Sequence, residues 1–143
     1  MSGSSPERRV PLGLALRDPL PWTPFVEIVR TAEQTAYEAL FLPEIGGRDA
    51  FAALAGLAAA TGTIRLGTGV VPVVARSASV TAMAAATVHE LSGGRMILGL
   101  GTGPPGPGAL ERLRRSVLTV RAALAGEPVD EPDGRRFRLS LGL

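Results

Sequence analysis

Residues 64–103 read IRLGTGVVPVVARSASVTAMAAATVHELSGGRMILGLGTG, and this stretch decides the fold. It contains two apolar runs, and both end in the tetrapeptide LGTG, at residues 66–69 and 100–103. The segment between them is alanine-rich and has a helical pattern, so the whole fits one strand–helix–strand crossover of about 30 residues. Glycines that directly follow a buried strand let a ligand approach the backbone closely. The stretch therefore predicts a parallel α/β fold with a binding site at the carboxyl ends of its strands.

The rest of the chain continues this alternation of strands and helices. Thr23 and Pro24 predict the start of the first helix, with a hydroxyl cap followed by proline at the first helical position. Asp49 is the predicted cap of the second helix, and Gly62 follows its end. The expected strands are 10–16, 39–42, 64–71 and 96–100, and the expected helices are 24–36, 50–61, 79–91 and 110–124.

Strands that alternate with helices imply a parallel sheet covered by helices, either as a small doubly wound sheet or as a piece of a barrel. A full (βα)8 barrel takes about 250 residues, so a chain of 143 residues has room for half of one. We expect a (βα)4 domain over residues 10–126, a disordered segment over 1–9 and a C-terminal tail over 127–143. Residues 135–143 of the tail are basic and partly alternating, and they could form an edge strand.

Composition excludes several classes of function. The chain has no cysteine and one histidine, which excludes a disulfide framework, a zinc site and a Ser-His-Asp triad. Its net charge is only +2 and its 15 basic residues, all arginine, are scattered, whereas nucleic-acid binding requires a concentrated basic surface. No apolar stretch approaches the roughly 20 residues that span a bilayer, and no secretory signal is visible. We therefore expect a soluble cytoplasmic protein that binds neither nucleic acid nor membranes and holds no metal.

The segment 101–106 formally matches the GxGxxG pattern of dinucleotide-binding proteins. A phosphate cradle uses backbone N–H groups at the turn and at the start of the following helix. Pro104 and Pro105 have no N–H to offer, and the strand is the fourth of the array rather than the first. A plain strand-to-helix loop explains the segment better, which weakens a Rossmann-type nucleotide binder as a hypothesis.

Three positions at the predicted strand ends are candidates for a site. Gly69 and Val70, where the third strand ends, fit a tight bend or a non-proline cis bond against a planar ligand, and the residues alone favour the bend. Glu44 directly follows the second strand and is equally consistent with an acid/base or ligand-anchoring role and with a surface carboxylate. Arg76 could bind an anionic group of a ligand, although a solvated loop arginine explains it slightly better.

Taken together, these segments resemble the luciferase-like monooxygenase family, whose members are (βα)8 barrels that use FMN or the deazaflavin coenzyme. The most specific matches are residues 64–72, 91–95 and 98–103, and the resemblance extends from residue 10 to about residue 137. This combination is far more specific than any single glycine motif. The resemblance implies a flavin- or deazaflavin-dependent oxidoreductase that transfers a hydride or activates oxygen on a small organic substrate.

The resemblance also assigns roles to residues. It implies that Gly69 and Val70 form the non-prolyl cis peptide bond that backs the isoalloxazine ring, and that Glu44 is the acidic, catalytic position at the end of the second strand. It adds a set of residues on the cofactor face, which with Arg76 completes the cofactor-binding candidates: Thr68, Gly101, Thr102 and Gly103. Two departures affect this assignment: Ile45 and Gly46 stand where the family often has histidines, and Ser77 and Ala78 replace the usual His-Pro.

The length is the larger departure, since the family uses about twice this chain and holds the cofactor phosphate mainly with the second half. Half a barrel leaves strand edges and an apolar inner face without a partner, and such surfaces favour association. Three outcomes are therefore open: a homodimer that closes into a barrel, pairing with a separately encoded second half, or a remnant that binds no cofactor. The last corresponds to an alternative function, a non-catalytic half-barrel subunit for binding or assembly.

Overall fold

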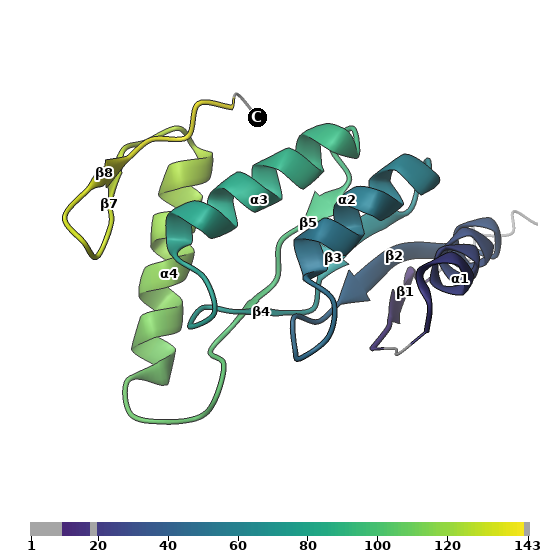
Figure 1. Ribbon diagram of the computed structural model, residues 1–143, viewed down its shortest axis with the longest axis horizontal. Helices are drawn as coiled ribbons and strands as arrows, with labels where there is room; N and C mark the ends of the chain where they lie inside the picture. The colour runs from purple at the N-terminus through teal and green to yellow at the C-terminus, as the bar shows by residue number, and fades with distance from the viewer. Residues whose placement is uncertain (1–9, 18–19, 142–143) are drawn as a thin grey trace, which may run out of the picture.

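Four βα units follow one another along the chain in the computed structural model, which describes residues 10–17 and 20–141 (Figure 1). The strands are β1 (Leu12–Ala15), β2 (Tyr37–Leu42), β3 (Arg65–Thr68), β4 (Val71–Pro72), β5 (Met96–Ile97), β6 (Leu100–Gly101), β7 (Val129–Asp130) and β8 (Arg136–Phe137). The helices are α1 (Trp22–Gln34), α2 (Ala50–Ala60), α3 (Ala78–Leu91) and α4 (Ala109–Leu124). In Figure 1, β1 and α1 lie at one end of the molecule, and α4 lies with β7 and β8 at the other.

The sheet is parallel, as the sequence predicts. Strands β1, β2, β3 and β5 are neighbours in that order, and β4 pairs with β6 in the same parallel sense. In register, Leu40 lies beside Leu66, which lies beside Met96, and farther along Val71 lies beside Leu100. Both LGTG segments therefore end at the same edge of the sheet.

The third and fourth predicted strands are each split in two. The third is divided into β3 and β4 by the peptide bond between Gly69 and Val70, which is cis. The fourth is divided into β5 and β6 at Gly99, whose amide donates to the hydroxyl of Thr68 at 2.8 Å. The hydrophobic pattern continues across both interruptions, so the sequence alone favoured unbroken strands and a simple bend at Gly69.

The hydrophobic core lies between the sheet and the helices. Side chains alternate along a strand, so every second residue points toward the helical layer. Leu40 and Leu66 from the sheet are fully buried there against Leu54 and Leu57 of α2 and Phe25 of α1. Because the residues of this layer are buried and packed against one another, the strand ends are held in fixed positions at the edge of the sheet.

Phe41 covers the opposite, inner face of the sheet, where glycines leave room for its ring. A Cβ atom on Gly67 would lie 2.6 Å from Phe41 Cδ1, and one on Gly69 would lie 2.9 Å from Phe41 Cβ. These distances are well below van der Waals contact, so the close approach of Phe41 requires glycine at both positions. The glycines of the first LGTG segment thus serve packing on the inner face as well as backbone exposure.

Two charged side chains bind the loops at the amino ends of the strands. Oε1 of Glu33 accepts hydrogen bonds from the amides of Gly62, Thr63 and Ile64, at 3.0, 2.6 and 2.8 Å. Burial raises the pKa of the Glu33 carboxyl, but the bonds from these three amides outweigh burial and lower it. Arg95 donates to five acceptors: the carbonyl oxygens of Ala58, Thr61, Ile64 and Ser92 and the hydroxyl of Thr61.

The start of α1 differs from the prediction. The helix begins at Trp22 and its N-cap is Pro21, which makes no side-chain cap, so the predicted capping by Thr23 is wrong. The Pro21 carbonyl accepts from the amide of Phe25 at 3.2 Å, which starts the helical ladder two residues before Thr23. The cap of α2 is confirmed, since the Asp49 side chain accepts from the amide of Ala52 at 2.9 Å.

The tail forms a hairpin rather than an extra strand of the parallel sheet. Strand β8 pairs antiparallel with β7, with Phe137 opposite Val129. Both side chains pack on a second apolar cluster formed with Ala82 of α3 and Val120 and Ala123 of α4. This cluster explains why the tail folds over the helices instead of extending along the sheet edge.

The predicted disordered segment, residues 1–9, lies outside the described residues. Within residues 10–17 and 20–141, no helix combines the length and the hydropathy needed to cross a membrane. A cytoplasmic location stays a prediction.

Candidate functional site

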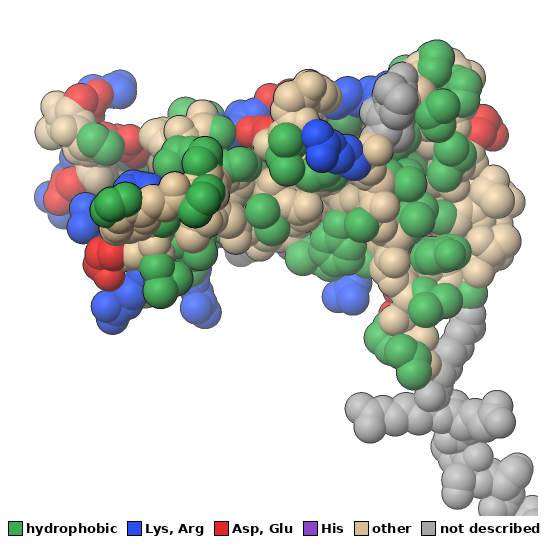
Figure 2. Space-filling view, turned by 90° about the horizontal axis from the view of Figure 1, so that it is seen from below, with side chains coloured by type: hydrophobic (Ala, Val, Ile, Leu, Met, Phe, Trp, Pro, Cys, Tyr) green, Lys and Arg blue, Asp and Glu red, His purple; other side chains and the backbone are tan. Residues whose placement is uncertain are grey.

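The loop after β2, the segment from Val70 to Pro72 and the loop after β6 lie at the carboxyl edge of the sheet, at the bottom of Figure 1. They surround an open hollow of about 430 Å³, which is within the usual range of about 300–1,000 Å³ for small-molecule sites. Figure 2 views the molecule from this side and shows hydrophobic side chains spread over the face. The residues that line the hollow are Glu44, Ile45, Val70, Pro72, Gly101, Thr102, Gly103 and Pro104.

Five predicted site residues are thus brought together, and Val70 is central among them. Its side chain is 39% exposed and lies across the backbone of β6, since a Cβ atom on Gly101 would be only 2.5 Å from Val70 Cγ2. The Val70 carbonyl accepts from the amide of Glu44 at 3.2 Å, and the amide of Gly69 donates to Leu42 at 2.8 Å. The cis peptide unit is therefore tied to the end of β2 on both sides, and it presents an apolar wall.

Gly103 extends this wall at the far side of the hollow. Its φ is +74°, a conformation that favours glycine, and a Cβ atom there would lie 2.7 Å from Val74 Cγ2. The hydroxyl of Thr102 donates to the Gly103 carbonyl at 3.1 Å. The second LGTG segment thus supplies backbone rather than side chains to the hollow.

Thr68 was predicted to line the cofactor face, but the structure places it beneath that face. Its side chain is 1% exposed, and its hydroxyl both accepts from the Gly99 amide and donates to the Gly99 carbonyl, at 2.8 Å each. A Cβ atom on Gly99 would lie 2.2 Å from the Thr68 carbonyl oxygen. Thr68 therefore joins the two interrupted strands and does not reach the hollow.

Glu44 and Arg76 form an ion pair instead of presenting separate charges to a ligand. Arg76 Nε lies 2.7 Å from Glu44 Oε1, and Arg76 Nη2 lies 3.1 Å from Glu44 Oε2. Oε2 also accepts from the amide of Ala50 at the start of α2, at 3.3 Å. The two side chains are 15% and 19% exposed, respectively. Glu44 still borders the hollow, but Arg76 does not, and its predicted contact with an anionic ligand group has no counterpart in this geometry.

Asp49 is a second carboxylate partner of Arg76. Its position in the sequence indicates only a helix cap. It contacts Nη2 of Arg76, and the guanidinium carbon lies 5.2 Å from the centroid of the Phe51 ring. The hydrogen bonds that Arg76 donates to Glu44 raise the pKa of Arg76, burial opposes this, and the bond to Asp49 raises it further. Burial raises the pKa of Asp49, but hydrogen bonds from Ala52 and Arg76 outweigh it and lower it. Both carboxylate partners are thus arranged around a cation.

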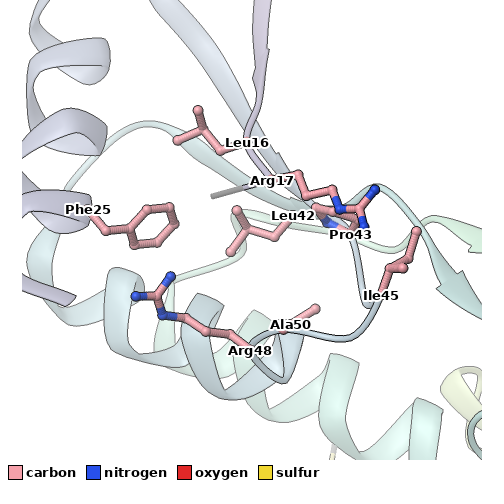
Figure 3. A pocket seen from close by; sticks show the side chains of 9 residues that line it. Leu16, Arg17, Phe25, Leu42, Pro43, Ile45, Arg48 and Ala50 are labelled. Carbon is pink, nitrogen blue, oxygen red and sulfur yellow. The ribbon is translucent and has the colours of Figure 1, made fainter. Parts of the chain in front are cut away.

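A second, smaller cleft lies beside the first, on the other side of Ile45 (Figure 3). Its volume is about 40 Å³, which holds no more than a few water molecules. Figure 3 shows Arg48 extending from the start of α2 toward Phe25, and its guanidinium carbon lies 4.9 Å from that ring centroid. This cleft is a packing junction between α1 and the loop after β2, too small for an organic substrate.

Neither hollow has the ligands for a metal. Among the residues that the structure describes, no group of three or more histidine, cysteine, aspartate or glutamate side chains is placed to hold an ion.

Comparison with known sequences places this arrangement among characterised proteins. A model of the luciferase-like monooxygenase family matches residues 8–142. The chain is 38% identical over 125 residues to a Mycobacterium tuberculosis protein with the name "putative coenzyme F420-dependent oxidoreductase", covering 80% of this chain and 36% of the relative. It is 34% identical over 110 residues to 5,10-methylenetetrahydromethanopterin reductase of Methanolobus tindarius, covering 70% of this chain and 34% of the relative.

Solved structures show the same fold at lower identity. The coenzyme F420-dependent tetrahydromethanopterin reductase of Methanopyrus kandleri superposes with a TM-score of 0.79 and 24% identity, over 85% of this chain and 42% of that chain. A type II Baeyer-Villiger monooxygenase of Pseudomonas putida, in complex with FMN, superposes with a TM-score of 0.74 and 14% identity, over 93% of this chain and 44% of that chain. The chain thus spans less than half the length of these proteins. It belongs to the luciferase-like monooxygenase family and carries one half of that family's barrel.

Proposed function

We propose that this chain is one half of a flavin- or deazaflavin-dependent oxidoreductase that acts on a small organic substrate. The observation that carries the proposal is the hollow of about 430 Å³ at the carboxyl edge of the sheet. Val70 forms one apolar wall of it, and the half-buried backbone of Gly101 and Gly103 borders it as well. A flat, largely apolar ring is the ligand shape that such walls suit.

The residues present fit such a ring. Gly101 has no side chain, whereas a Cβ atom there would displace Val70, so the wall stays smooth. Pro72 extends the wall, and as a proline it has no backbone N–H group that an apolar ring would leave unpaired. Val70 and Pro72 would orient the ring and exclude water from one of its faces. When bound, the coenzyme supplies the hydride transfer or the oxygen activation, and the protein supplies position and environment.

The relatives' names narrow the cofactor to the flavin type. One relative is named for coenzyme F420, another is named as a methylenetetrahydromethanopterin reductase, and one structural neighbour was solved with FMN. We propose hydride transfer or oxygen activation as the reaction. The two coenzymes are separate arms of the test below.

A second half-barrel is the proposed partner. The parallel sheet has β1 at one edge and β5 at the other, and each pairs on one side only within the described residues. The chain covers 36% of the M. tuberculosis relative, so the matched residues make up only part of a barrel of that size. We propose a second copy of this chain, or a chain carrying the other half, as the partner that completes it.

Titration tests the proposal directly. FMN and coenzyme F420 are each added to the purified chain, alone and with a second half-barrel chain, while absorbance and fluorescence of the coenzyme are recorded. Gly101→Ala is expected to weaken binding about tenfold, or about 1.4 kcal/mol, because its Cβ would push Val70 into the hollow. Gly62→Ala is the matched control, since a Cβ there meets nothing within 4 Å. No spectral change with either coenzyme in any mixture contradicts the proposal.

A non-catalytic assembly subunit is the second candidate, and one observation favours it. Both carboxylate oxygens of Glu44 already accept hydrogen bonds, and the next residues, Ile45 and Gly46, offer no proton-transfer group. Sedimentation separates the two functions when combined with the titration. An assembly that binds neither coenzyme supports the subunit, and one that binds a coenzyme supports the enzyme.

A further inference from the structure

Arg76 connects the loop after β4, which carries it, with the loop after β2, which borders the hollow. It directly precedes Ser77, the N-cap of α3, whose side chain accepts from the amide of Val80. Its guanidinium reaches across to Glu44 and Asp49, which belong to the loop between β2 and α2. One side chain thus fixes the starts of α2 and α3 relative to each other.

The contact continues from Glu44 into the hollow. The Glu44 carboxylate is held by Arg76, and the Glu44 amide donates to the Val70 carbonyl at 3.2 Å. Val70 in turn forms the exposed apolar wall over Gly101. A displacement of Glu44 therefore changes the position of the wall itself.

The charges make this arrangement depend on the arginine. Two carboxylates, Glu44 and Asp49, face one guanidinium, and the start of α2 assists both since helix N-termini favour negative charge. Paired, fork-shaped hydrogen bonds between arginine and carboxylate are stronger and more directional than those a lysine can make. Without Arg76, two like charges would lie together at a partly buried site and repel each other.

We propose that Arg76 is a positioning residue of the hollow, acting through Glu44 on Val70, and that Glu44 positions the wall rather than transferring protons. The inference rests on the proposed function only for its coenzyme readout. Its structural readout, the stability of the bond between the Glu44 amide and the Val70 carbonyl, needs no ligand.

Amide hydrogen exchange measures that bond in the full chain. Arg76→Gln is expected to speed exchange at the Glu44 amide about tenfold, and Arg76→Lys less, because charge-assisted hydrogen bonds are lost in the first case and weakened in the second. Arg135→Gln is the matched control, since Arg135 pairs with Asp133 at 2.6 Å but is 80% exposed on the hairpin. If Arg76→Gln does not fold, Arg76→Lys decides. Exchange at Glu44 equal to that of the control overturns the inference.

A double-mutant cycle tests whether Arg76 and Glu44 act on the hollow through one contact. FMN affinity is measured for Glu44→Gln, Arg76→Gln and the pair of changes together. If both residues act through one contact, the double variant binds FMN with the same affinity as the single variant that has the lower affinity. Additive losses overturn the inference. If the native chain binds no FMN, the proposed function fails in that arm, while the exchange experiment still decides the role of Arg76.

Discussion

Replacing Thr68 with valine tests how the interrupted strands are held together. Valine keeps the shape of threonine but removes the hydroxyl, which is bonded in both directions to Gly99 at 2.8 Å. The Gly99 carbonyl keeps a second partner, the amide of Val71 at 2.9 Å, so only the Gly99 amide loses its partner. An unsatisfied amide costs about 1–3 kcal/mol when buried, and Gly99 is half-buried, so we expect about 1–2 kcal/mol.

Urea unfolding at constant m-value and thermal unfolding measure this change. The melting temperature is expected to fall by about 4–8 °C, because about 1 kcal/mol corresponds to about 4 °C for a domain of this size. Thr68→Ser keeps the hydroxyl and is the control, losing only the methyl contact of about 1 kcal/mol. A valine variant as stable as the native chain, within about 0.5 kcal/mol, would refute the role of this hydroxyl.

Three further changes test other parts of the fold. Glu33→Gln should reduce the loss of stability in acid. The pKa of Glu33 is lowered from 4.5 in the folded chain, so its carboxylate stabilises the fold above pH 4.5, and this stabilisation is lost as pH falls through the folded pKa. Urea unfolding of both chains between pH 7 and pH 3 measures the difference. Arg95→Lys should lower the free energy of unfolding in urea by about 2 kcal/mol, since one ammonium cannot bind five acceptors around the start of β3. A loss no greater than that caused by Arg135→Lys would count against this role. Gly56→Ala should cost about 1–3 kcal/mol, because its Cβ would lie 2.7 Å from Trp22 Cζ2, and Trp22→Leu in the same chain should recover part of the loss if the clash is the cause.

The order of elements followed from local patterns in the sequence. Alternating apolar runs and helical periodicity identified all four βα units, and Asp49 was correctly placed at the start of α2. The start of α1 was missed because Thr23 and Pro24 form a typical capping pair, whereas Pro21 starts the ladder through its carbonyl alone. Backbone carbonyls carry no sequence signal, so such a shift is invisible before the structure is known.

The site was predicted in part, and the charge contacts that were missed share a cause. Val70 and the second LGTG segment were correctly placed at one edge because parallel strands present their carboxyl ends together. The pairing of Arg76 with Glu44 joins residues 32 positions apart, and each looked like an independent ligand contact in the sequence. Asp49 was hidden by its capping role. Long-range charge pairing depends on the register of the sheet, which the sequence does not state.

The most direct test is a nuclear magnetic resonance titration of the ¹⁵N-labelled chain, alone and with a second half-barrel chain, with FMN or coenzyme F420. We predict that the largest amide shifts fall at Val70, Val71 and the backbone of Gly101 and Gly103, with little change at Arg95 on the far edge of the sheet. Shifts centred on the hairpin of β7 and β8, or no shifts with either coenzyme, would contradict it.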